Sequence, residues 1–250
     1  MTSDLFIREE QTLKGDINRV NNLYVSDGAC IYGNVYAIGD VYVQENVTIT
    51  GDIYSVGRVN IGDGSIVEGE VNSNGDVYIG NFVRIGGNIT SSTNIYIGDE
   101  ANLDNVESQG NITGGDSISA KNIMTAGDIK LGFDISARNI ISSACIQIAG
   151  GLYATSIVAQ GQVAIDQEQV AMGNNINVEK IIATGKITLG DGIDVDLIET
   201  HHDVILGNNV QVSRILSKRS VLIGENGLIG KIERAGSIYL GKDTKCLSVK

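Results

Sequence analysis

Aliphatic residues recur along this chain at an almost constant interval. A first set of positions, called column A, begins at Val35, Ile53, Val71 and Ile89, which are 18 residues apart. The later intervals are 17 residues, except for one of 24. The column continues through Val106, Ile123, Ile140, Ile157, Ile181, Ile198, Ile215 and Ile232. A repeat of this length predicts a stack of similar structural units.

Each repeat contains short segments in which apolar and polar residues alternate. Column B lies six residues after column A, for example at Val41 and Val59. Column C lies six residues after column B, for example at Val47, and is followed two residues later by another aliphatic residue, Ile49. Alternation with a period of two is typical of a β-strand with one buried face. We therefore expect three strands in each repeat, joined by corners.

These strands predict an all-β fold. One coil cannot bury its apolar face alone, but stacked coils share a continuous core. We predict a single-domain triangular β-helix, or β-solenoid, over residues 1–250, with about 13 coils of 17–18 residues each. The 24-residue interval holds an insertion, residues 166–175, which is expected to form a loop between coils.

Two sets of small residues fit this geometry. The residue two positions after column A is Ala, Ser or Thr almost throughout, from Ala37 to Ser217. A narrow bore near a corner admits only small side chains there, and each hydroxyl could bond to a neighbouring coil. Glycine also stands two residues before column B in eight repeats, where we expect it to turn a corner with positive φ. These glycines are Gly39, Gly57, Gly75, Gly110, Gly127, Gly161, Gly185 and Gly236.

Composition limits the range of functions. The 250 residues include 32 Gly, no Pro and no Trp, and 18 basic against 30 acidic residues give a net charge of −12. This charge argues against nucleic acid as a partner. No apolar run approaches the roughly 20 residues of a membrane helix, and no secretory signal is recognisable. With three Cys in no paired spacing, these features lead us to expect a cytoplasmic location.

Candidate chemistry is sparse. His201 and His202 are adjacent, so on a strand they would point to opposite faces and could not readily share a metal ion. A zinc site of the γ-carbonic-anhydrase kind needs three ligands. No base recurs beside the serine positions or beside Cys30, Cys145 and Cys246. The acidic residues fall at corners and outward positions, as expected for a solvated surface. We predict no catalytic residue, no cofactor, no metal site and no small-molecule substrate.

Apolar residues also fall at outward positions of face A, the face that carries column A. Four consecutive coils place Met124, Ile141, Val158 and Ile182 at the same outward position, where they are expected to form an apolar strip. Such strips usually mark interaction surfaces. With two residues of the insertion, the candidates for a lateral contact are Met124, Ile141, Val158, Ile182, Val170 and Met172.

The strand pattern continues almost to both ends of the sequence. A β-solenoid exposes unpaired strand edges at its ends unless a cap covers them, and no amphipathic helix, charged run or Pro is recognisable as a cap. We therefore expect the terminal coils to stack end to end on other copies of the chain. The predicted polymer interface consists of Leu5, Ile7, Leu13, Ile238, Leu240, Cys246, Leu247 and Val249.

Short units of Gly, Asp or Asn, and an aliphatic residue repeat within this pattern. They are Gly39-Asp40-Val41, Gly51-Asp52-Ile53, Gly75-Asp76-Val77, Gly87-Asn88-Ile89, Gly110-Asn111-Ile112 and Gly127-Asp128-Ile129. In these units the chain resembles the bactofilin family of polymer-forming cytoskeletal proteins. The resemblance implies a right-handed triangular β-helix that polymerises end to end without nucleotide. Its non-polar filaments would scaffold cell shape or localise other proteins. The chain departs from the family in having many more coils and no Pro-containing tails.

Three other functions remain open. A left-handed hexapeptide-repeat acyltransferase also has coils of this length, but it usually needs a catalytic His near a protruding loop. A right-handed polysaccharide lyase or hydrolase normally has longer coils. An ice-binding solenoid needs an outward Thr-x-Thr array, which no face carries. We therefore predict that the chain is not an enzyme but a scaffold whose partners are copies of itself, and which could also hold other proteins or a membrane.

Overall fold

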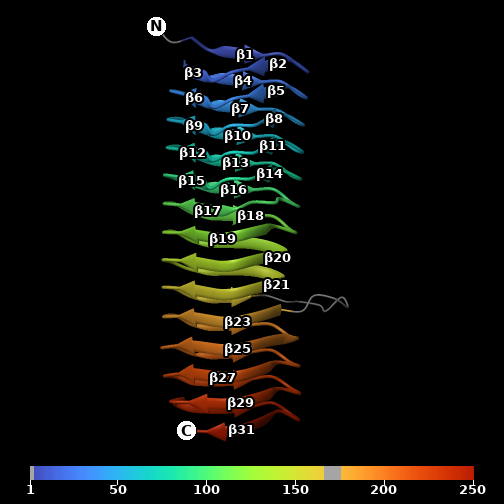
Figure 1. The fold of residues 1–250 in the computed structure, drawn as a ribbon. Helices are drawn as coiled ribbons and strands as arrows, with labels where there is room; N and C mark the ends of the chain where they lie inside the picture. Colours follow the sequence, from blue (N-terminus) through green and yellow to red (C-terminus); the bar gives the residue numbers. More distant parts are fainter. Residues whose placement is uncertain (1–2, 166–175) are drawn as a thin grey trace. The chain divides into compact units, whose positions relative to one another are not determined.

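A computed structural model describes residues 3–165 and 176–250 of the chain. All regular structure in these residues is β-strand, and none of it is helical. The strands pair in parallel with strands of neighbouring turns, mostly in register; a register shift between Ile17 and Val20 interrupts the pairing of the first face A strand. The fold is therefore a β-solenoid, as predicted, with about 14 turns in the described residues. The chain divides into two compact units, Met1–Gly127 and Asp128–Lys250, and the prediction of a single domain stays a prediction. Figure 1 shows both units and labels many of their strands.

The amino-terminal unit has three faces, each a ladder of parallel strands. Face A consists of β3 (Ile17–Val20), β6 (Val35–Ala37), β9 (Ile53–Ser55), β12 (Val71–Ser73), β15 (Ile89–Ser91), β17 (Asn105–Ser108) and β19 (Ser119–Thr125). Face B consists of β1 (Leu5–Ile7), β4 (Leu23–Val25), β7 (Val41–Val43), β10 (Val59–Ile61), β13 (Val77–Ile79), β16 (Ile95–Ile97) and β18 (Ile112–Gly114). Face C consists of β2 (Thr12–Lys14), β5 (Cys30–Tyr32), β8 (Thr48–Ile49), β11 (Ile66–Val67) and β14 (Arg84–Ile85).

The carboxy-terminal unit has longer strands. The two longest, β20 (Ile129–Ser142) and β21 (Ile146–Ala159), each run through positions of all three faces. Each of the following turns contains two strands. One short strand lies on face B, and one longer strand covers faces C and A. The face B strands are β22 (Val163–Ile165), β24 (Ile187–Leu189), β26 (Val204–Leu206), β28 (Ser220–Ile223) and β30 (Ser237–Leu240). The others are β23 (Ile176–Ala183), β25 (Ile193–Thr200), β27 (Gln211–Ser217), β29 (Leu228–Glu233) and β31 (Lys245–Val249).

The change from 18 to 17 residues per turn occurs at the corner between faces C and A. In the early turns three residues separate the buried positions of the two faces, as between Ile49 and Ile53. In the later turns only two residues separate them, as between Leu103 and Val106. The residue that is lost is the glycine represented by Gly51. The shorter corner lets the strands of faces C and A join, and this explains the longer strands of the carboxy-terminal unit.

The core consists of the predicted columns. Val47, Ile53 and Val59, one from each column, are at most 1% exposed. The register between neighbouring strands continues across the 24-residue interval. Ile157 of β21 lies beside Ile181 of β23. The predicted loop 166–175 itself lies outside the described residues.

The predicted reason for the corner glycines was wrong. None of the eight glycines before column B has positive φ. At seven of them, however, an added Cβ would lie within 3.0 Å of the preceding turn; at Gly57 it would lie 2.7 Å from the carbonyl carbon of Gly39. Close approach of the turns, rather than backbone conformation, excludes a side chain there.

Positive φ occurs instead at the corner between faces B and C. The residue five positions after column B is left-handed in every turn where it is described. Most of these residues are not glycine, and Asn and Asp, which tolerate this conformation best among them, occupy several of the positions. The residues are Glu10, Gly28, Asn46, Gly64, Phe82, Glu100, Ser117, Asp134, Gly151, Gly192, Asn209, Asn226 and Asp243.

Candidate functional site

The last strand, β31, exposes side chains at positions that are buried in the turn before it. Cys246 lies beside Ile229 and Val249 beside Ile232 on the preceding strand β29. Ile229 and Ile232 are fully buried, but Val249 is 58% exposed and Cys246 is half-buried. In the described residues, no strand other than β29 pairs with β31. The inward side chains of β31 therefore have cover on one side only.

Strand β30 shows the same contrast on face B. Leu240 lies beside Ile223, and Ile238 lies beside Val221, both of which are buried. Leu240 is 42% exposed and Ile238 is half-buried. Leu247, which was also predicted for the polymer interface, is 75% exposed. All five predicted residues of this end are thus at least partly accessible.

The amino-terminal turn is better covered. Leu5 and Ile7 of β1 lie beside Leu23 and Val25, and Ile7 is only 3% exposed. Leu13 of β2 lies beside the buried Ile31 and is itself half-buried. The two sets of predicted interface residues therefore differ, because the apolar side chains of the last turn are more exposed than those of the first.

The predicted apolar strip is present in part. In the carboxy-terminal unit, Ile141, Val158 and Ile182 lie side by side on β20, β21 and β23. Ile141 is 37% exposed, and the other two are half-buried. Met124 is half-buried in the amino-terminal unit, beside Glu107. Val170 and Met172 lie outside the described residues.

Both histidines are exposed, and His202 takes part in the corner through its backbone. The backbone N–H of His202 donates to Thr200 Oγ1 at 3.0 Å, and its carbonyl accepts from Ser217 Oγ at 2.8 Å. Among the described residues, no group of three His, Cys, Asp or Glu side chains could hold a metal ion. No helix of the described residues is long and apolar enough to cross a membrane.

The inward serines are structural, as expected. Ser55, Ser73 and Ser91 are buried, and their hydroxyls donate to the carbonyls of Gly39, Gly57 and Gly75 in the preceding turn, at 2.6, 2.7 and 2.9 Å. A hydroxyl that is buried and already donates its proton to a carbonyl is poorly placed to act as a nucleophile. These residues stabilise the stack of turns.

The acidic corner residues have a role that the sequence interpretation missed. Their side-chain oxygens accept hydrogen bonds from backbone N–H groups one turn later. Asn22 Oδ1 accepts from Asp40 N at 2.9 Å, and Asp40 Oδ1 accepts in turn from Arg58 N at 2.7 Å. Similar ladders run along the other two corners, for example from Asp52 to Glu70 N and from Asp63 to Asn81 N, both at 2.8 Å. The recurrence of Asp and Asn at fixed spacing was the signal for them.

Two of these carboxylates have a shifted pKa. The pKa of Asp76 is lowered mainly by a side-chain hydrogen bond from Thr93, with further hydrogen bonds from Asn94 and Tyr78. The pKa of Asp4 is lowered mainly by the side chain of Asn21 and the backbone of Asn22. Both shifts reflect hydrogen bonding of the charged form within the corners.

Comparison of the chain with protein-family models, with curated proteins and with solved structures finds no match.

Proposed function

We propose that this chain is a non-enzymatic scaffold protein that assembles end to end into filaments without nucleotide. The observation that carries the proposal is the exposure of Leu240, Cys246 and Val249, whose counterparts one turn earlier are buried. A second copy that continues the stack would cover them. The earlier resemblance to bactofilins points to the same function.

The energetics favour such a contact. Burial of an exposed aliphatic side chain stabilises a contact by about 2 kcal/mol. The edge of β31 also carries backbone N–H and C=O groups that another parallel strand could satisfy, and exposed strand edges commonly pair in this way. A stacked copy would therefore supply both the apolar cover and the hydrogen bonds that each internal turn receives from its neighbour.

The test combines negative-stain electron microscopy with sedimentation velocity on the full chain. Wild-type protein is expected to form filaments one solenoid wide in buffer without nucleotide. A charge at an inward terminal position should prevent assembly, because an ionised side chain is costly to bury. We expect Leu240→Lys and Leu13→Glu each to shift the protein from filaments to short species.

Ser136 provides the matched control. It is exposed in the interior of β20, so Ser136→Lys and Ser136→Glu add the same charges away from the ends and should leave filaments intact. Circular dichroism of each variant would establish that the strands still form. Discrete wild-type monomers at high concentration, or equal effects of the terminal and Ser136 variants, would overturn the proposal.

A further inference from the structure

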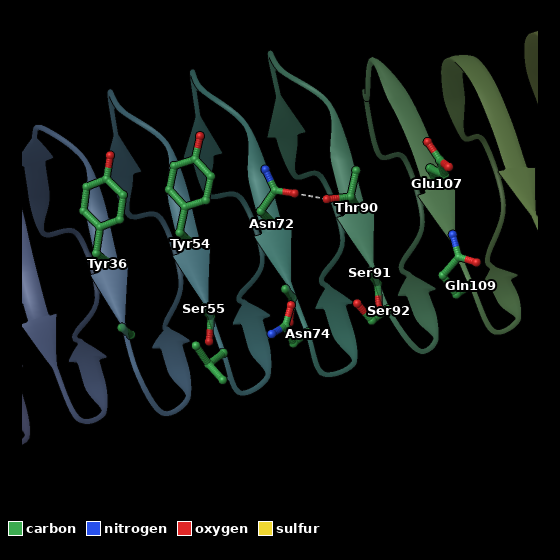
Figure 2. A pocket seen from close by; sticks show the side chains of 13 residues that line it. Tyr36, Tyr54, Ser55, Asn72, Asn74, Thr90, Ser91, Ser92, Glu107 and Gln109 are labelled. Atoms are coloured by element: carbon green, nitrogen blue, oxygen red, sulfur yellow. Dashed lines mark hydrogen bonds between the residues drawn. The ribbon is translucent and has the colours of Figure 1, made fainter.

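A shallow groove of about 620 Å³ runs across face A of the amino-terminal unit. One side of it is a row of outward side chains from five successive strands, β6, β9, β12, β15 and β17 (Figure 2). Strand register aligns these residues one per turn. In order along the row they are Tyr36, Tyr54, Asn72, Thr90 and Glu107.

The row begins with an aromatic surface. The rings of Tyr36 and Tyr54 are nearly parallel, with an interplanar angle of 3° and centroids 5.1 Å apart. Figure 2 shows the two side chains next to each other on adjacent strands, and the side chain of Tyr36 is 37% exposed. Val56, which is 58% exposed, adds apolar surface beside them. This end of the groove offers a platform for a flat, weakly polar ligand.

The row continues with short polar groups. The Thr90 hydroxyl donates to Asn72 Oδ1, which directs the amide oxygen toward Thr90. The Asn72 amide nitrogen points away from that contact in Figure 2. Glu107 supplies a carboxylate acceptor, and Asn74 and Gln109 supply further amides along the other side of the groove. Amides, hydroxyls and carboxylates in a line suit a ligand that carries many hydroxyl groups.

The groove disfavours a polyanion. The residues that line it include Glu107 but no Lys or Arg. The Tyr54 hydroxyl donates to Asp52 at 3.5 Å, and its pKa is raised by burial and by the charges of Asp52 and Glu70. Nucleic acids and anionic glycans depend on basic side chains for binding, so both fit this surface poorly.

The groove also offers no edge to which a peptide could add a strand. Strand β9 is paired with β6 on one side and with β12 on the other, and β12 is paired in turn with β15. Strand addition needs unpaired backbone groups. A peptide would therefore have only side-chain contacts here, whereas a chain of sugar rings uses ring faces and hydroxyls, which match the aromatic and polar parts of the row.

From these observations we infer that face A of the amino-terminal unit binds a linear, uncharged, β-1,4-linked polysaccharide that lies along the row. Pyranose rings have an apolar face that can stack on Tyr36 and Tyr54, and their hydroxyls can reach Asn72 and Glu107. A β-1,4-linked chain is extended and flat, and its advance per sugar ring, half of its two-ring repeat, is comparable to the strand spacing of about 4.8 Å. The inference is independent of filament formation and concerns binding alone.

The test is isothermal titration of the full chain with cello-oligosaccharides and chito-oligosaccharides of increasing length. These ligands are monovalent, so the affinity of a single site is measured even within a filament. We expect affinity to rise with oligosaccharide length until the row is filled. Tyr54→Ala should weaken binding about tenfold, while Tyr54→Phe, which keeps the ring, should bind nearly as well as wild type.

Tyr78 offers the matched control, because it is stacked on Tyr96 with centroids 4.8 Å apart but lies on face B. Tyr78→Ala should leave oligosaccharide binding unchanged. The inference is overturned if wild-type protein binds neither oligosaccharide series, if Tyr78→Ala and Tyr54→Ala lose affinity equally, or if heparin binds more tightly than the neutral sugars.

Discussion

Single residues at the corners determine how closely the turns approach. Gly57 leaves no room for a Cβ, which would lie 2.2 Å from Asp40 Oδ1 of the turn before. Asp40 is itself held there, because its Oδ1 accepts a hydrogen bond from Arg58 N at 2.7 Å. Glycine and aspartate are thus both parts of one corner contact, in which the small residue allows the side-chain oxygen to reach the next backbone N–H group.

A substitution at Gly57 should therefore cost more than one at a left-handed glycine with space around it. Gly57→Ala forces the turns apart, and we expect a loss of about 3 kcal/mol in the free energy of unfolding. Gly28 has φ of +66° and only a 3.5 Å contact with Glu10 Cγ, so Gly28→Ala should cost about 1 kcal/mol. Urea unfolding of both variants checks this, and an equal loss would contradict the close-approach explanation.

Asp76 should make stability depend on pH. Its folded pKa is lowered, mainly by Thr93, so its contribution is fully present above the unfolded value of about 3.9 and is lost as pH falls through the folded pKa. Asn is expected to replace the acceptor oxygen without titrating. The Asp76→Asn variant should lose less stability than wild type between pH of about 6 and about 2. Urea unfolding at several pH values measures this, and parallel curves for the two proteins would refute it.

At the scale of the strands, the pairing register places equivalent residues of successive repeats side by side. The outward aromatic residues of face B stack directly, with ring centroids of 4.8 Å for Phe6 and Tyr24 and 5.1 Å for Tyr24 and Tyr42. The parallel pairing of the strands brings these rings into contact. The same register aligns the polar row of the proposed groove.

Strand lengths were less predictable than strand positions. The shift from 18 to 17 residues per turn is plain in the sequence, but the periodicity alone does not say which corner loses a residue. Comparison of Ile49–Ile53 with Leu103–Val106 places the loss between faces C and A. There the corner becomes short enough for one strand to continue into the next. Boundaries of this kind depend on hydrogen bonds between turns, which local sequence does not contain.

At the scale of the whole molecule, the net charge of −12 opposes association of copies. Raising the ionic strength from about 0.01 M to about 0.15 M shortens the Debye length from about 30 Å to about 8 Å and so weakens this repulsion. If the end contacts are apolar, filaments should form at lower protein concentration as salt increases. Sedimentation at several salt concentrations tests this. Filaments that dissolve in salt would instead indicate an ionic contact between ends.

The sequence by itself determined the repeat, the inward columns and the all-β solenoid. The reason is that the repeat length and the alternation of apolar and polar residues are properties of the residue order alone. Only the tertiary structure decided that close approach of the preceding turn requires glycine at Gly57. It also decided that Asp40 accepts a hydrogen bond from a backbone N–H of the next turn, and which side chains line the groove with Tyr54 and Asn72. These features arise from residues about one turn apart in sequence, so their geometry depends on how closely the turns stack. The exposure of Val249 beside the buried Ile232 is likewise a property of the folded stack.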